Sequence, residues 1–362
     1  MTTYSDLLDA IVRVVYGHGL SAAADQVRMA ASMAFEQLPM LARWNRYRAY
    51  TRLLVNNQVV GRANYSDGTL TLDSGEWPSW AVGCSVMVSN YRCMIASIAG
   101  NVATLSVRPS TATSGDVSYA LYHDCLDLPA DFIVVDSIHS YDPPYQLEPG
   151  DRSEVYRDYG PQMPAALPAR FTIEPGVANY RLRLFPPPCQ RAQLDLIYWR
   201  RIKMPVHSGR DAITSRGTID VTGTSVAGNG TSFRTDMIGA VLRIGDAERI
   251  PTGLDGLSPY VAESLIEDVI DTDSMTLMRD VGDFSDVRYC ITDVLDIDPH
   301  MFFLLMALSM QSLSQILGKK IAVDVDAALR EAKSADARQA GIYGGADQGT
   351  VRTVYLTSRI GQ

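Results

Sequence analysis

The sequence has few of the residues from which common catalytic and metal sites are built. Its five cysteines are odd in number and include no Cys-x-x-Cys pair, so neither a disulfide framework nor a zinc knuckle is indicated. There is no Gly-x-Ser-x-Gly, no His-Glu-x-x-His, no Gly-Lys-Ser/Thr phosphate loop and no Gly-x-Gly-x-x-Gly after a strand. We therefore expect a protein that is not an enzyme, has no cofactor and keeps its cysteines as small buried hydrophobic residues.

Histidine is also sparse, and the five copies are scattered along the chain: His18, His123, His139, His207 and His300. A lone histidine is more often a turn or core residue than a ligand or base. We predict no metal site from them, although a triad of residues distant in the sequence stays open.

One group of acidic residues, Asp268, Asp271 and Asp273, raises the question of calcium. The stretch lacks the glycine and the terminal glutamate of an EF-hand loop. Because Asp and Ser form turns readily, we interpret residues 270–274 as a hairpin turn.

Positive charge and long hydrophobic runs are both scarce. The net charge of −9 argues against a surface that grips nucleic acid, which needs clustered Lys and Arg. The longest apolar run, residues 301–310 broken only by Ser309, is too short to span a bilayer, and the N-terminus lacks the features of a signal peptide. We expect no membrane partner and synthesis in a reducing cytoplasm, and the 46% hydrophobic content permits two or three domains.

The sequence does contain one β-rich module twice, with divergent residues. The matched segments, first copy against second, are 68–72 and 217–221, 80–83 and 236–239, 85–88 and 241–244, 95–98 and 266–269, 103–105 and 275–277, and 116–119 and 286–289. Two copies are too few for a stacked array, so the pattern indicates insertion into a scaffold. We predict two inserted modules, at residues 59–125 and 213–292.

Helical signals occupy both ends of the chain. Thr3 and Asp6 form a capping box before an apolar stripe, and a second helix follows Ser21 and ends at Pro39. Near the other end, Asp298 and Pro299 begin a helix that runs to residue 317, and a last helix ends at residue 341. We expect the helices of the two ends to pack together.

Proline-punctuated strands fill residues 126–206. The predicted fold class is therefore α+β: a helical core with a short antiparallel β segment and two inserted small β-barrel or sandwich modules. The core is assigned to residues 1–58, 126–212 and 293–341, and residues 342–362 form a C-terminal arm.

Two stretches are candidate contact surfaces. Residues 43–52 interleave arginines with aromatics, a composition enriched at protein interfaces and also suited to stacking single-stranded nucleic acid. The candidate interface residues are Arg43, Trp44, Arg46, Tyr47 and Arg48. The arm is either a frayed tail or a strand that completes a partner's sheet, and its candidate residues are Tyr343, Val351, Arg352, Val354, Tyr355 and Leu356.

A family resemblance rests on segments in a fixed order: 128–135 (LPADFIVV), 145–149 (YQLEP), 171–175 (FTIEP), 180–188 (YRLRLFPPP), 194–201 (LDLIYWRR) and 327–333 (AALREAK). This order resembles the head-to-tail adaptor proteins of tailed bacteriophages. Residues 217–277, with 228–233 (GNGTSF), are similar to a β module that recurs as an insertion in phage structural proteins.

The resemblance implies a ring of subunits, twelve if it matches the portal, that joins the portal vertex to the tail in the virion. Its partners would be the portal protein, adjacent subunits and the tail or next connector protein, while DNA passes through the channel without specific binding. The alternative is a tail-associated module that recognises carbohydrate or a host receptor through aromatics such as Trp77, Trp80 and Tyr91; a hydrolase is the third possibility.

Overall fold

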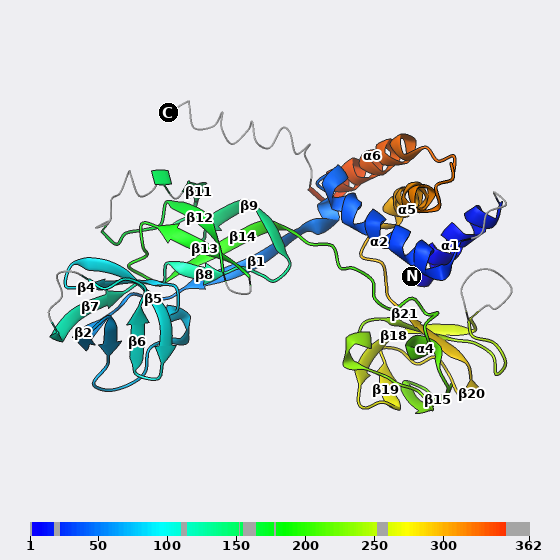
Figure 1. Cartoon of the computed structure of the whole chain (residues 1–362), viewed down its shortest axis with the longest axis horizontal. Coiled ribbons are helices and arrows are strands. Elements are labelled where there is room, and N and C mark those ends of the chain that lie inside the picture. Colours follow the sequence, from blue (N-terminus) through cyan, green and yellow to red (C-terminus); the bar gives the residue numbers. More distant parts are fainter. Residues whose placement is uncertain are drawn as a thin grey trace. The chain divides into compact units, whose positions relative to one another are not determined.

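The structure, a computed structural model, describes residues 2–17, 22–109, 114–151, 153–154, 164–176, 179–251 and 260–344. The chain divides into two compact units. The helical unit is drawn from residues 1–46 and 202–362, and the sandwich unit is Tyr47–Arg201. Each unit contains one of the two β modules, so the segments predicted as a single core are divided between the units (Figure 1).

The predicted fold class, a helical core with a short β segment, is wrong. Strands account for 38% of the chain and helices for 26%, and the strands form four sheets. The error arises in residues 126–201, where short strands assemble into two four-stranded sheets that enclose a hydrophobic core of their own. Pairing between strands distant in the sequence creates this core, and local signals do not reveal such pairing.

The described part of the helical unit contains four long helices, α1 (Tyr4–Gly17), α2 (Ala24–Leu41), α5 (Phe302–Leu317) and α6 (Val325–Gly344), and the one-turn helix α4 (Ala212–Ser215). The α5 helix packs against α1, α2 and α6, which confirms that the two ends of the chain pack together. Its residues Leu304, Leu305 and Leu308 are buried, together with Phe35 and Leu38 of α2. With the preceding turn, residues 299–317 are long and apolar enough to cross a membrane, a test that the core helix of a soluble protein also passes.

Local capping sets the helix limits. The capping box at α1 is confirmed, because the amide of Thr3 donates to Asp6 Oδ2 at 3.0 Å and the amide of Asp6 donates to Thr3 Oγ1 at 3.4 Å. The α2 helix continues past Pro39, where we expected it to end. The indole of Trp44 donates to the Leu38 carbonyl at 2.8 Å, so that carbonyl near the end of α2 is satisfied from outside the helix.

The core of the sandwich unit lies between two sheets. The first has the order β1 (Arg48–Val55), β14 (Ala192–Arg200), β9 (Phe132–Ser140) and β10 (Tyr145–Gln146). The second has the order β11 (Glu148–Pro149), β12 (Arg170–Pro175), β13 (Tyr180–Phe185) and β8 (Cys125–Asp127). Leu182, Leu184, Leu194 and Leu196 meet in the core.

The first β module closes into a barrel with the order β2 (Val59–Ser66), β3 (Thr69–Thr71), β6 (Val102–Leu105), β5 (Tyr91–Ala99), β4 (Ser85–Val88) and β7 (Gly115–Leu121). A short helix, η2 (Ser79–Ala81), precedes β4. Closure leaves this barrel no free edge.

The second module follows the same path through β20 (Phe284–Val287), β15 (Thr218–Thr222), β16 (Ser225–Asn229), β19 (Ser274–Leu277), β18 (Ala262–Val269), β17 (Val241–Ile244) and β21 (Tyr289–Thr292). Here η3 (Thr235–Met237) precedes β17, and a bulge follows Ile266 in β18 as one follows Ile95 in β5. The predicted repeat is therefore visible in the strand order. Its opening match is off by one strand, since residues 68–72 contain β3, whose neighbours correspond to those of β16 and not of β15.

A buried arginine joins each module to the rest of its unit. In the sandwich unit, Arg183 of β13 donates to Gly83 of the barrel at 2.9 Å and to Glu174 at 2.9 Å, and it pairs with Asp124 at 3.3 Å. Asp124 in turn accepts two hydrogen bonds from Ser85 of β4. Although Arg183 alternates with Leu182 and Leu184 along β13, its side chain is only 3% exposed.

In the helical unit the corresponding residue is Arg243 of β17. Its guanidinium donates to both oxygens of Asp6 in α1, at 2.9 and 3.0 Å, and to Glu263 at 3.2 Å, and it stacks on the ring of Tyr260. Only 1% of the Arg243 side chain is exposed. Burial raises the pKa of Asp6, but the bonds from Arg243 outweigh burial and hold that pKa below its usual range. The second module is thus fastened to α1 by this ion pair, and the amide of Ser5 adds a hydrogen bond to Thr292 Oγ1 at 3.0 Å.

Replacing Arg243 with methionine should lower the free energy of unfolding by about 3 kcal/mol, because it removes the cation from between two largely buried carboxylates. The matched control is Arg62→Met, whose partner Asp116 is exposed and which should lower the free energy of unfolding far less than Arg243→Met does. Urea unfolding followed by tryptophan fluorescence measures both. Equal losses in the two variants would contradict the role assigned to Arg243.

Candidate functional site

A cluster of polar side chains lies in the helical unit next to the places where the chain passes to the sandwich unit. The chain passes between the units at Arg46–Tyr47 and at Arg201–Ile202. We call Asn45, Arg46, Asp296, Asp298, His300 and Asp336 the crossover cluster. Arg46 pairs with Asp296 at 3.2 Å and with Asp298 at 3.1 Å, and the amide of Lys203 donates to Asp296 at 3.1 Å. The cluster therefore holds both segments that leave the helical unit.

The start of the helix after residue 298 brings two members of the cluster together. Asp298 is the N-cap of η4 (Pro299–Met301), with proline at the first helical position, as the sequence predicts. Its carboxylate makes no capping hydrogen bond and turns instead to Arg46. His300 follows one residue after the proline, so Asp298 and His300 lie on the same helical turn.

The third side chain comes from α6. Asp336 is buried and accepts from Asn45 twice, from the backbone amide at 3.3 Å and from the side-chain amide at 2.9 Å. Its one ion-pair contact among the described residues is with His300, and no lysine or arginine pairs with it there. Burial raises the pKa of Asp336 above its usual value.

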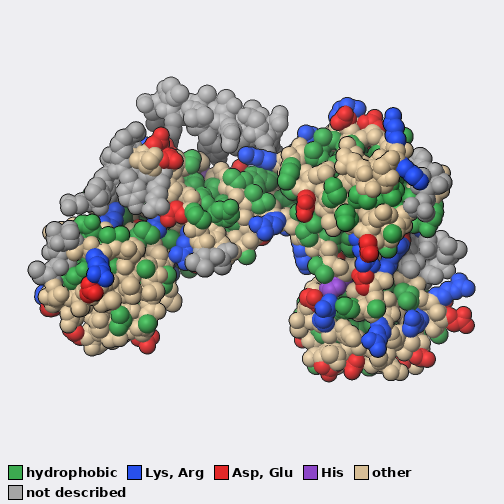
Figure 2. Space-filling model, in the orientation of Figure 1, with side chains coloured by type: hydrophobic (Ala, Val, Ile, Leu, Met, Phe, Trp, Pro, Cys, Tyr) green, Lys and Arg blue, Asp and Glu red, His purple; other side chains and the backbone are tan. Residues whose placement is uncertain are grey.

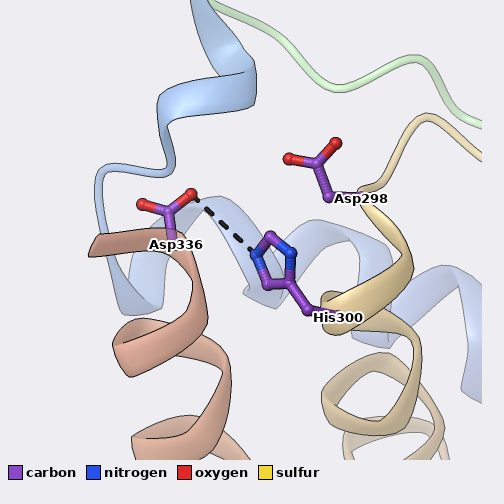
Figure 3. A group of neighbouring side chains, drawn as sticks. All are labelled: Asp298, His300 and Asp336. Carbon is purple, nitrogen blue, oxygen red and sulfur yellow. Dashed lines mark ion pairs between the residues drawn. The ribbon is translucent and has the colours of Figure 1, made fainter. Parts of the chain in front are cut away.

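His300 of η4 points toward Asp336 of α6 (Figure 3). Its Nε2 lies 4.0 Å from Asp336 Oδ1, is buried, and has no hydrogen-bond partner among the residues that the structure describes. One ligand atom from each of Asp298, His300 and Asp336 lies within 4.8 Å of the other two. An imidazole and two carboxylates at this spacing are groups that can hold a metal ion.

The predicted contact stretch 43–52 is largely occupied by the fold itself. Trp44 is 1% exposed and Tyr47 is 2% exposed, so neither ring is available for stacking on a partner or on nucleic acid. Arg46 belongs to the crossover cluster, and the exposed Arg48 is bound to Asp136 of β9 through two nitrogens. Arg43 is exposed. Of the five predicted interface residues, the arginines alone reach the surface.

The arm predicted at residues 342–362 falls mostly outside the described residues. Tyr343 lies in α6, which continues to Gly344 instead of ending at residue 341. Val351, Arg352, Val354, Tyr355 and Leu356 lie beyond the described residues.

A recess lies in the sandwich unit, where the barrel meets the sheets. It has a volume of about 360 Å³ and is lined by residues that include Arg52, Trp80, His123, Asp127 and Arg181. Its polar groups are engaged: Arg181 donates to Asp127 at 2.8 Å, Arg52 to Asp195 at 3.2 Å, and Trp80 stacks on the His123 ring at 4.4 Å. These bonds leave little capacity for a ligand.

The aromatics proposed for carbohydrate stacking are likewise part of the fold. Trp77 is 5% exposed and its indole donates to the Asn101 carbonyl at 2.9 Å, while Trp80 and Tyr91 are half-buried. Stacking on a sugar needs a free ring face. This arrangement does not favour the carbohydrate alternative.

The acidic stretch at residues 268–273 is confirmed as a turn. The amide of Ile270 donates to the Ser274 carbonyl at 3.0 Å, and the amide of Asp273 donates to Asp271 Oδ1 at 2.8 Å. These bonds close the connection between β18 and β19.

No family model and no curated protein matches this chain.

Sequence reasoning missed the metal-ligand geometry of the crossover cluster. It treated His300 as a scattered histidine and Asp298 only as a helix cap, and Asp336 drew no attention. The spacing Asp298-x-His300 at the start of a helix is the one local signal, because it places two ligand types on one turn. The third ligand comes from another helix, which only the fold brings close.

His123 makes stability depend on pH. Its ring is buried and accepts a hydrogen bond from the Asn56 amide at 2.9 Å, and burial lowers its pKa from 6.5 to about 4. The unfolded chain therefore binds a proton that the folded chain does not, so stability contributed by neutral His123 is lost as pH falls from about 6.5 toward 4. The urea midpoint should fall over this range, and more steeply than in His123→Asn.

Asparagine suits that comparison because its Oδ1 occupies the place of Nδ1 and can still accept from Asn56. The control is His139→Asn, which replaces a half-buried histidine and leaves His123 intact, so it should keep the wild-type pH slope. The same slope in His123→Asn and wild type would contradict the assignment.

Proposed function

We propose that this chain is a structural protein of a tailed bacteriophage, and that it forms a ring joining the portal vertex of the head to the tail. The observation that carries the proposal is the order of elements along the chain. A helical hairpin (α1, α2), a β segment containing the resembling residues 128–201, and C-terminal helices (α5, α6) follow one another as in the adaptor proteins that the sequence resembles. The ring would have twelve subunits if it matches the portal.

The surface is consistent with assembly through two different faces, which is the contact type that generates rings. Both units expose large apolar side chains. Met40 and Phe303 of the helical unit are 82% and 64% exposed, and Tyr50 and Leu54 of β1 are 56% and 51% exposed. Strand β1 also has a sheet partner on one side only among the described strands, which leaves its other edge able to pair.

The charge distribution fits a channel protein that does not hold DNA. Lys and Arg side chains are interspersed with Asp and Glu on the face drawn in Figure 2, and the described residues of that face form no large basic patch. Arg48, Arg52 and Arg62 are each paired with an aspartate. Specific grip on DNA would need unpaired basic groups in a cluster.

The central experiment is to purify the full chain and record its mass by native mass spectrometry, and its shape by electron microscopy, with and without the portal protein. We expect a closed ring, or a ring that forms on the portal. A chain that stays monomeric in both conditions and is absent from virions would rule out the proposal.

Deleting the arm should separate attachment from folding. Because α6 continues to Gly344, the deletion should begin at residue 345 and not at 342. We expect the truncated chain to keep its unfolding midpoint and to lose attachment to the portal, as measured by co-sedimentation. A chain of the same length with residues 345–362 in scrambled order is the control, and attachment by the truncated chain would show that the arm is dispensable.

A further inference from the structure

We propose that Asp298, His300 and Asp336 bind one divalent cation of the first-row transition metals, with Zn²⁺ as the representative ion. The site is independent of the ring proposal, since it rests only on the crossover cluster of a single chain. Three ligand atoms from the start of α5 and from α6 converge there (Figure 3).

The first observation is an imidazole nitrogen that the protein leaves unsatisfied. Nε2 of His300 is buried and has no hydrogen-bond partner among the described residues. Buried polar atoms are nearly always paired, and those that are not call for a ligand, a water or an ion. The ion-pair contact of this nitrogen, Asp336 Oδ1, lies at 4.0 Å, beyond hydrogen-bond distance.

The second observation is a buried carboxylate without a cationic side chain. Asp336 is 8% exposed, and in the part of the chain that the structure describes its neighbours are the amide groups of Asn45 and the imidazole of His300. Burying a carboxylate is costly unless a cation or a full set of hydrogen bonds accompanies it. A metal ion between Asp336 and His300 would satisfy both groups at once.

The geometry leaves room for metal bonds. Zinc lies about 2.0–2.2 Å from its nitrogen and oxygen ligands, so two ligand atoms of one ion are at most about 4.4 Å apart. The three ligand atoms already lie within 4.8 Å of one another, and small side-chain rotations would close the remaining gap.

The donor set selects the class of metal. Calcium and magnesium prefer oxygen ligands alone, whereas imidazole favours zinc, cobalt, nickel and related ions. One imidazole and two carboxylates provide three protein ligands, which leaves at least one coordination position for water. The site thus resembles neither a closed four-ligand structural site nor a calcium loop.

The position of the site indicates which part of the helical unit a bound ion would stabilise. It would tie η4 to α6 beside Asn45, which lies two residues before the chain enters the sandwich unit at Tyr47. Binding would therefore stabilise the end of the helical unit from which the connecting segments leave.

The test is isothermal titration of the untagged full chain with ZnCl₂, in a Cys189→Ser background because Cys189 is the one cysteine that is not buried. We expect one equivalent to bind, and Zn²⁺ to raise the thermal unfolding midpoint. His300→Ala and Asp336→Asn should each weaken binding at least about tenfold and abolish the rise in midpoint. Asp336→Asn keeps the shape of the side chain and an acceptor for Asn45, so it should fold.

The matched control is His139→Ala, which removes a half-buried histidine of the sandwich unit and should bind Zn²⁺ as the parent does. Co²⁺ titration gives a second readout, because its visible absorption reports nitrogen and oxygen coordination. Failure of the parent chain to bind Zn²⁺, or equal binding by His300→Ala and the parent, would overturn the proposal.

Discussion

The pairing of one buried arginine with carboxylates fixes each β module to its unit. Arg183 and Arg243 are almost fully excluded from solvent. Arg183 connects β13 of the sheets to the first module, and Arg243 connects β17 of the second module to α1. A buried guanidinium is tolerated only where its donors are satisfied, so these pairs fix position more strictly than apolar packing alone. The arrangement of each unit depends on this constraint. A module that is bound through a buried ion pair is an integral part of its unit and not a loosely tethered domain.

This changes the meaning of the repeated module. The sequence pattern predicted two peripheral modules inserted into a helical scaffold. In the structure the second copy shares Asp6 with the cap of α1, so one carboxylate both begins a helix and holds the barrel. The two copies have the same strand order and a bulge at the same place. The first is bound to a sheet strand, β13, and the second to a helix, α1.

The sequence predicted best what depends on neighbouring residues. The capping box at Thr3 and Asp6 and the helix start at Asp298 and Pro299 are local, and both were confirmed. The sandwich was missed because its strands pair across long stretches of chain, as β1 does with β14. The burial of Arg183 could not be predicted for the same reason, because its partner Asp124 lies 59 residues earlier in the chain.

The candidate site shows a similar division. Asp298 and His300 are two residues apart, and their proximity could have been read from the sequence. Asp336 joins them only because α6 packs on the start of α5. In residues 43–52 the composition suggested a surface, whereas the fold used Trp44 to complete the end of α2 and buried Tyr47 as well. Composition alone does not distinguish an aromatic side chain that is exposed and free to bind a partner from one that is buried within the chain's own fold.

The division of the chain into units also determines the order in which they can fold during synthesis on the ribosome. The sandwich unit is one continuous stretch, Tyr47–Arg201, whereas the helical unit needs both ends of the polypeptide. Domains fold as they emerge, so the central unit can be complete while α1 and α2 still lack α5, the helix that covers their apolar faces. The nascent chain therefore carries an exposed helical hairpin through most of its synthesis, and its need for protection by chaperones should end only when α5 emerges.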